Sequence, residues 1–155
     1  MFNIRVYGLL INNEQEILVS DELIKGKYYT KFCGGGLEFG EGTHECLIRE
    51  FKEEMDLNVE VLEHLYTTDY YQPSMFNPQH QMMSIYYIVR ALEPIKIKLK
   101  ETAFDFDETQ IKKHAETGQT ESFRFIPHHL FSPDLLSLPI DKIAAKVFKE
   151  KTAPK

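Results

Sequence analysis

Several features that mark particular classes of protein are scarce or missing in this chain. Its 155 residues contain no Trp and only two Cys, and its 18 Lys and Arg are outnumbered by 24 Asp and Glu, which gives a formal net charge of −6. Nucleic-acid backbones select basic surfaces, so this balance argues against DNA or RNA as a partner. A small phosphorylated ligand is compatible with it, because bound metal ions can invert the local field.

The few cysteines and the lack of long apolar runs point to a cellular compartment. Cys33 and Cys46 do not have the spacing of a metal-binding pair and suggest no disulfide framework, as is typical of reduced thiols in a cytosolic protein. No apolar stretch is long enough to cross a bilayer, and residues 1–5 do not begin a signal peptide. We therefore expect a cytoplasmic protein with no membrane partner.

The order of apolar and polar segments predicts a single domain over residues 1–155. A chain of this length can bury a core of its own, and it contains no internal repeat, low-complexity tract or linker. The apolar runs and their spacing predict strands at 2–11, 16–19, 59–71, 81–92, 95–99 and 123–126, and helices at 43–55 and 141–149.

Turn residues and polarity predict the connections. Residues 12–15 have turn chemistry, so the first two strands should form a hairpin. Residues 21–31 are polar and should form a loop, and so should the glycines that follow. The polar segment 101–119 has no pattern that assigns it an element.

The glycine-rich segment and the helix after it carry the chemistry of this chain. Glu50, Glu53 and Glu54 occupy positions i, i+3 and i+4, which share one face of a helix. Three adjacent carboxylates repel one another, so a solvated helix gains nothing from them. Mg²⁺ and Mn²⁺ prefer oxygen ligands, and Mg²⁺ often bridges carboxylates to a phosphate. The pattern therefore indicates a metal-dependent enzyme that acts on a phosphate compound.

A simpler explanation of the charges is a solvated helix surface. Glu45, Arg49 and Glu53 follow i, i+4 spacing, and each such pair stabilises a helix by ~0.2–0.5 kcal/mol. Surface pairing does not explain why a dense group of glycines stands directly before the helix.

The same segment resembles the signature of the Nudix hydrolases, in which eight of nine specified positions match. The matching residues are Gly35, Glu41, Arg49, Glu50, Phe51, Glu53, Glu54 and Leu57. Asp56 stands where the family has a glycine, at a helix end that often adopts a left-handed conformation, which Asp tolerates better than most residues. The resemblance implies an α/β/α sandwich with a mixed central sheet. It also implies hydrolysis of a nucleoside diphosphate derivative with Mg²⁺ or Mn²⁺.

The resemblance also implies roles for individual residues. Arg49 is expected to pair with Glu41 and orient the loop against the helix, although Glu38 and Glu41 are alternative outer metal ligands. The expected metal ligands are Glu50, Glu53, Glu54 and the carbonyl of Gly34, and the expected substrate contacts are Gly35, Gly36 and Glu38. The glycines could instead be ordinary turn residues.

The general base is expected either within the matched segment or in a later loop. Glu53 and Glu54 are the catalytic candidates inside the segment. Glu116 and Glu121 are the candidates outside it, and Glu116 is favoured because the sequence around it reads as a loop.

Substrate class is weakly encoded. Nucleotide sugars or ADP-ribose-like compounds are favoured over nucleoside triphosphates, because Pro73 lies near a proline of ADP-ribose-cleaving relatives. A non-catalytic nucleotide sensor is a further alternative, whereas an isoprenyl diphosphate isomerase would need a Cys and Glu pair that we cannot place. A homodimer is the default assembly. Candidates for stacking on a nucleobase are Tyr70, Tyr71, Phe76, Tyr86 and Tyr87.

Overall fold

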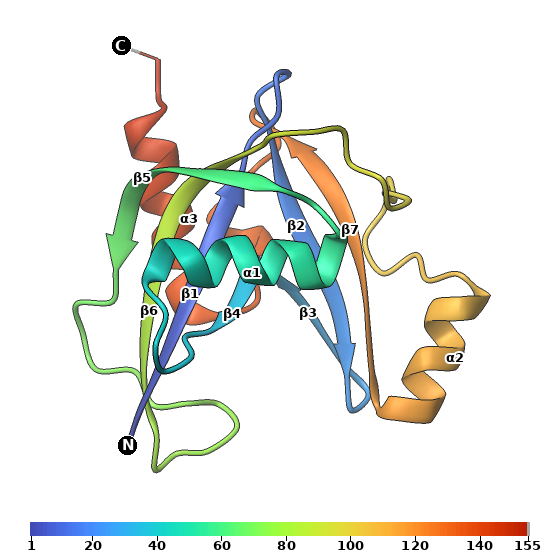
Figure 1. The fold of residues 1–155 in the computed structure, drawn as a ribbon, viewed down its shortest axis with the longest axis horizontal. Coiled ribbons are helices and arrows are strands. Elements are labelled where there is room, and N and C mark those ends of the chain that lie inside the picture. Colours follow the sequence, from blue (N-terminus) through green and yellow to red (C-terminus); the bar gives the residue numbers. More distant parts are fainter. Residues whose placement is uncertain (155) are drawn as a thin grey trace.

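The computed structural model describes residues 1–154, so the last residue of the predicted domain, 155, lies outside the described residues. Figure 1 shows the arrangement of the elements. In chain order these are β1 (Phe2–Leu10), β2 (Glu16–Ile24), β3 (Lys27–Lys31), β4 (Cys33–Gly36), α1 (Thr43–Met55), β5 (Val59–Thr67), β6 (Gln81–Ala91), α2 (Glu108–Thr117), β7 (Gln119–Pro127), the 3₁₀ turn η1 (Pro133–Leu135) and α3 (Pro139–Lys151).

The strands form two sheets. The first is mixed and has the order β4-β1-β6-β5, with β1 parallel to β6 and the other neighbours antiparallel. The second is antiparallel and has the order β3-β2-β7. Helix α1 lies across the front of the strands in Figure 1 and α3 lies behind them. The predicted α/β class with a mixed sheet is confirmed.

Alternation along β1 explains the two layers of core. Val6 and Leu10 belong to the cluster that includes Leu47 and Phe51 of α1. Tyr7 and Leu9 point to the other face of the sheet and join the cluster that contains the buried residues of α3. Successive residues of a strand point to opposite faces, so one strand serves both layers.

The predicted hairpin between the first two strands is wrong. Asn12 makes the expected turn, where its Oδ1 accepts hydrogen bonds from the amides of Glu14 and Glu16. Beyond an isolated bridge between Ile11 and Ile17, however, β1 and β2 separate into different sheets. Pairing of β1 with distant β6 is therefore favoured over pairing with its neighbour in sequence.

The predicted loop at 21–31 and strand at 95–99 are also wrong. Most of residues 21–31 belong to β2 and β3, and the polar residue Asp21 is fully buried there. Residues 95–99 form no strand, although Ile95, Ile97 and Leu99 pack partly buried against the α1 side of the core. A polar segment can form a strand when its polar groups are buried with partners. A segment in which apolar and polar residues alternate can also be a loop that packs its apolar side chains against the core.

Two further segments are more regular than predicted. Cys33 and the three glycines at 34–36 form edge strand β4, and the unassigned segment 101–119 contains α2. Asp107 caps the start of α2 by accepting from the amide of Gln110, and Gly118 ends the helix with φ of 82°. No helix within residues 1–154 is long and apolar enough to span a bilayer.

Candidate active site

Arg49 joins the glycine-rich segment to α1. Its Nε and Nη2 donate to both carboxylate oxygens of Glu41, at 3.0 and 2.7 Å, and Nη2 also donates to the carbonyl of Gly36 at 3.1 Å. The hydrogen bonds from Arg49 lower the pKa of Glu41 to about 2. The pair predicted from the sequence is present, and its bidentate geometry fixes the loop before the helix.

The same guanidinium restrains two of the expected metal ligands. Nη1 of Arg49 donates to Glu50 at 2.9 Å and to Glu53 at 3.2 Å. Nη1 also lies 3.7 Å from Oε1 of Glu38, a largely exposed carboxylate. Glu50 and Glu53 are thus held by one cation on the same side of α1.

Close approach between β4 and α1 depends on glycine. An ideal Cβ on Gly35 would lie 2.3 Å from Oε1 of Glu50, so this carboxylate rests against the backbone of the glycine. Gly34 has φ of 153°, and a Cβ there would lie 2.0 Å from the carbonyl oxygen of Val6. The glycines therefore do more than permit a turn.

Glu54 has surroundings unlike those of its two companions. Within residues 1–154 it has no hydrogen-bond or ion-pair partner, and it lines a pocket of about 510 Å³. Burial, followed by the nearby charges of Glu121, Glu50 and Glu22, raises its pKa to about 8. A negative charge on Glu54 would therefore be poorly compensated at this end of the pocket unless a cation were bound there.

The expected metal ligands offer carboxylate and backbone oxygens to a divalent cation. No three His, Cys, Asp or Glu side chains within the described part of the chain already surround one point, and Arg49 holds the carboxylates of Glu50 and Glu53. The donor chemistry nevertheless fits, because carboxylate and backbone oxygens with uncompensated charge suit Mg²⁺ or Mn²⁺. Of the four expected metal ligands, Gly34 and Glu54 line the pocket.

The floor of the pocket follows from the alternation of β1. Asn3, Arg5 and Tyr7 share the face that further along the strand is apolar core. Arg5 donates through Nε to the hydroxyl of Tyr7 at 2.6 Å, and no carboxylate in residues 1–154 lies within ion-pair distance of it. An enclosed guanidinium without a carboxylate partner can bind an anionic ligand.

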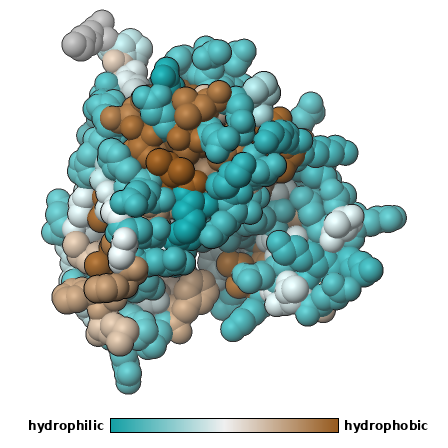
Figure 2. All heavy atoms as spheres, in the orientation of Figure 1, coloured by the Kyte–Doolittle hydropathy of each residue, from teal (hydrophilic) through white to brown (hydrophobic). Residues whose placement is uncertain are grey.

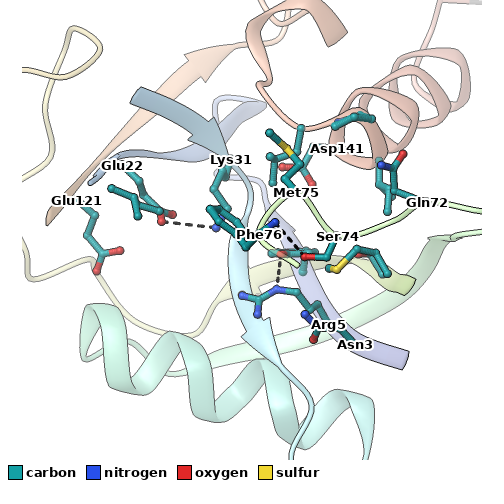
Figure 3. A pocket seen from close by; sticks show the side chains of 18 of the residues that line it. Asn3, Arg5, Glu22, Lys31, Gln72, Ser74, Met75, Phe76, Glu121 and Asp141 are labelled. Carbon is teal, nitrogen blue, oxygen red and sulfur yellow. Dashed lines mark hydrogen bonds and ion pairs between the residues drawn. The ribbon is translucent and has the colours of Figure 1, made fainter. Parts of the chain in front are cut away.

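Figure 3 shows how charge is distributed in the pocket. Glu22 and Glu121 lie at one end of the view, Gln72 and Asp141 lie towards the other, and Arg5 and Lys31 lie between them. Nζ of Lys31 is 3.5 Å from Glu22. The surface is hollowed beneath α1 in Figure 2.

The two candidates for the base outside the matched segment are placed very differently. Glu121 lines the pocket together with Glu54, and burial raises its pKa. Glu116 lies on exposed α2 rather than in a loop, 4.0 Å from Lys112, and does not line the pocket. Strand β7 carries Glu121 inward, whereas the helix turns Glu116 away.

Among the aromatic candidates, Phe76 and Tyr86 line the pocket, whereas Tyr70, Tyr71 and Tyr87 do not. Tyr86 is fully buried and donates a hydrogen bond through its hydroxyl to Asp141. Phe76 is 70% exposed and belongs to residues 72–76, which form one wall of the pocket.

Arg5, Lys31 and Glu22 line the pocket, although no motif in the sequence predicted this. Arg5 carried a usable signal, because a charged residue stands on a strand face that continues as Tyr7 and Leu9. Gly35, Gly36 and Glu38 do not line the pocket and lie beside it on the Arg49 side.

Comparison with known proteins identifies the family of this chain. The model of the NUDIX domain family matches residues 1–148. This chain belongs to the NUDIX domain family. Its fold is also that of solved Nudix structures. No curated protein matches the chain in sequence.

Solved Nudix structures share the fold at low sequence identity. A MutT protein from Methanosarcina mazei Go1 aligns with a TM-score of 0.68 and 13% identity over 99% of this chain and 96% of its own. An ADP-ribose pyrophosphatase from Streptococcus suis 89-1591 aligns with a TM-score of 0.57 and 16% identity, over 99% of this chain and 93% of its own. A UDP-X diphosphatase aligns with a TM-score of 0.61 and 14% identity, over 97% of this chain and 64% of its own. At such identities the similarity defines the fold and not the substrate.

Proposed function

We propose that this Nudix protein hydrolyses the diphosphate bond of a nucleoside diphosphate derivative with Mg²⁺ or Mn²⁺ as cofactor. The observation that carries the proposal is Glu54, a carboxylate without a partner in residues 1–154 that faces the same pocket as Arg5. A carboxyl group without a partner and a guanidinium without a carboxylate partner, both lining one pocket, suit a metal-bound diphosphate. The names of the ADP-ribose and UDP-X relatives support this substrate class.

The residues that would hold the cation are Glu50, Glu53, Glu54 and the carbonyl of Gly34. When bound, such an ion neutralises diphosphate oxygens and activates water for attack on phosphorus. Arg49 keeps the carboxylates of Glu50 and Glu53 oriented through its hydrogen bonds.

Two pocket residues act on the substrate side of the reaction. Arg5 binds and orients the diphosphate through the N–H groups that Tyr7 does not engage. Glu121 accepts the proton of the attacking water, because it lines the pocket beside Glu54 whereas Glu116 does not. Phe76 provides the exposed ring on which a nucleobase stacks. Direct substrate contacts by Gly35, Gly36 and Glu38 remain a prediction.

Hydrolysis by glutamine variants tests the proposal. ADP-ribose, UDP-glucose and a nucleoside triphosphate are incubated with Mg²⁺ or Mn²⁺, and release of mononucleotide or phosphate is measured. We expect Glu54→Gln and Glu121→Gln each to lower kcat by roughly 100-fold or more, since an amide binds a cation more weakly than a carboxylate and cannot act as a general base. Glu116→Gln should leave kcat near the wild-type value. Circular dichroism checks that each variant is folded.

Other outcomes would select the alternatives. Loss of activity in Glu116→Gln but not in Glu121→Gln would identify Glu116 on α2 as the general base. Hydrolysis of the triphosphate alone would favour nucleotide clean-up. Metal-dependent binding of these compounds without turnover would make the chain a nucleotide sensor.

A further inference from the structure

The side chain of Arg5 depends on one neighbour, Tyr7, for its direction. The hydroxyl of Tyr7 accepts a hydrogen bond from Nε of Arg5, and the guanidinium carbon lies 5.6 Å from the centre of the Tyr7 ring, which is within the range of a cation–π contact. The Arg5 side chain makes no other hydrogen bond or ion pair within residues 1–154. Both terminal nitrogens of the guanidinium therefore stay available to a ligand in the pocket.

The ring of Tyr7 is itself held firmly in place. It is 3% exposed and stacks on the ring of Tyr86, with the ring centres 5.4 Å apart and the planes at 28°. The backbone of Gly34 packs against it as well, because a Cβ on Gly34 would lie 3.0 Å from Cδ1 of Tyr7. Tyr86 is fully buried and is bound through its hydroxyl to Asp141. The Tyr7 hydroxyl is thus a fixed point in the wall of the pocket.

We propose that Tyr7 is a positioning residue that orients the guanidinium of Arg5 towards the diphosphate. This inference rests on the proposed function, in which Arg5 binds that group. A flexible side chain loses rotamer freedom when a ligand binds, and a guanidinium that is already fixed avoids this cost. Because Tyr7 engages Nε, the remaining nitrogens form a fork that matches two oxygens of a phosphate.

Tyr7→Phe tests the proposal, because it removes the hydroxyl and keeps the stacked ring. With ADP-ribose or UDP-glucose and Mg²⁺, KM should rise by roughly tenfold or more, since a hydrogen bond to a charged group is lost and the guanidinium is free to turn. The change in kcat should be smaller than the change in KM. Partial unfolding would instead lower the apparent kcat and leave KM unchanged, so the two constants separate positioning from loss of structure.

Tyr66→Phe is the matched control. The ring of Tyr66 also packs against Tyr86, at 6.2 Å between ring centres, and its hydroxyl also has a single partner, Asp69. Tyr66 does not line the pocket, so its replacement should leave KM near the wild-type value. A rise in KM as large as that in Tyr7→Phe would overturn the specific role of Tyr7.

The double variant shows whether Tyr7 acts through Arg5. Arg5→Met removes the guanidinium, so adding Tyr7→Phe to it should raise KM no further. An equal rise in KM with and without Arg5 would mean that the hydroxyl contacts the ligand directly, and would overturn the positioning role. An unchanged KM in Tyr7→Phe alone would overturn it too.

Binding measurements keep this proposal separate from the proposed catalysis. Calorimetric titration with inorganic diphosphate and Mg²⁺ should give a Kd that is raised roughly tenfold or more in Tyr7→Phe, and no further loss when Arg5→Met already carries the change. This pattern without hydrolysis of any compound would overturn the proposed function alone. Hydrolysis by the wild type, with equal Kd values in wild type and Tyr7→Phe, would overturn the positioning role alone.

Discussion

At the scale of single residues, the three consecutive glycines at 34–36 differ in whether their positions require glycine. Gly34 needs a backbone conformation that other residues rarely adopt, and Gly35 leaves space for the carboxylate of Glu50. Gly36 has neither constraint, since a Cβ there would meet only Nη1 of Arg5 at 3.8 Å. Density of glycine in the sequence therefore indicated close contact without indicating which glycine makes it.

Alanine at the first and third of these positions should have opposite consequences. Gly34→Ala should lower the free energy of unfolding by about 3 kcal/mol or more, because its Cβ would collide with the carbonyl of Val6 at φ of 153°. Gly36→Ala should be neutral or stabilise slightly, by up to ~1 kcal/mol. Urea unfolding of both variants measures this, and similar midpoints would contradict the assignment of strain to Gly34.

At the scale of elements, one buried carboxylate joins the three strands of the second sheet. Asp21 on β2 has no exposed surface and accepts hydrogen bonds from Nε of Arg124 on β7 at 2.6 Å and from Oγ1 of Thr30 on β3 at 2.7 Å. This compensation lets a charged residue occupy a buried strand position. The prediction of a loop at 21–31 failed because local polarity does not reveal such partners.

Removal of this carboxylate should unfold the protein more easily. Asp21→Ala should cost about 3–5 kcal/mol, because the largely buried guanidinium of Arg124, with a side chain 14% exposed, loses its partner. The double variant Asp21→Ala, Arg124→Met should recover part of the loss. Glu60→Ala, which breaks the exposed pair with Arg90 in the other sheet, should cost under ~1 kcal/mol. Thermal or urea unfolding measures the stability of these three variants. Equal losses of stability in Asp21→Ala and Glu60→Ala would refute the role of Asp21 in joining the strands.

At the scale of the whole molecule, Asp141 connects α3 to β6 and to the residue between β3 and β4, where it lines the pocket. It is 1% exposed and accepts hydrogen bonds from the hydroxyl of Tyr86 on β6 and from the amide of Phe32. Burial raises its pKa to about 6, against the opposing effects of the Tyr86 hydrogen bond and of Lys31. The charged group facing it on β2 is Glu22, which also raises the pKa.

This raised pKa gives a pH dependence of stability with a definite sign. The folded chain binds the proton of Asp141 more tightly than the unfolded chain, so stability from this group is full below about pH 4 and falls as the pH rises to about 6. Asp141→Asn removes this dependence. Its free energy of unfolding relative to wild type should rise by ~2–3 kcal/mol between pH 4 and 7. Urea unfolding across this range measures the difference, and parallel curves would exclude a titrating Asp141.

The sequence by itself determined the local part of this protein. Helical geometry fixes the spacing of Glu50, Glu53 and Glu54, and the Arg49–Glu41 pair depends on positions only eight residues apart. The strand positions at 2–10 and 81–91 were readable for the same reason, because alternation and β-compatible composition are properties of short segments.

Only the tertiary structure decided what faces the pocket. Arg5, Lys31, Glu54 and Glu121 come from four elements that meet through parallel pairing of β1 with β6 and through packing of the two sheets. Glu116 and Glu121 stand five residues apart, yet only Glu121 reaches the pocket. Contacts between distant segments determine which residues meet, and the free energy of those contacts is not encoded in any single segment.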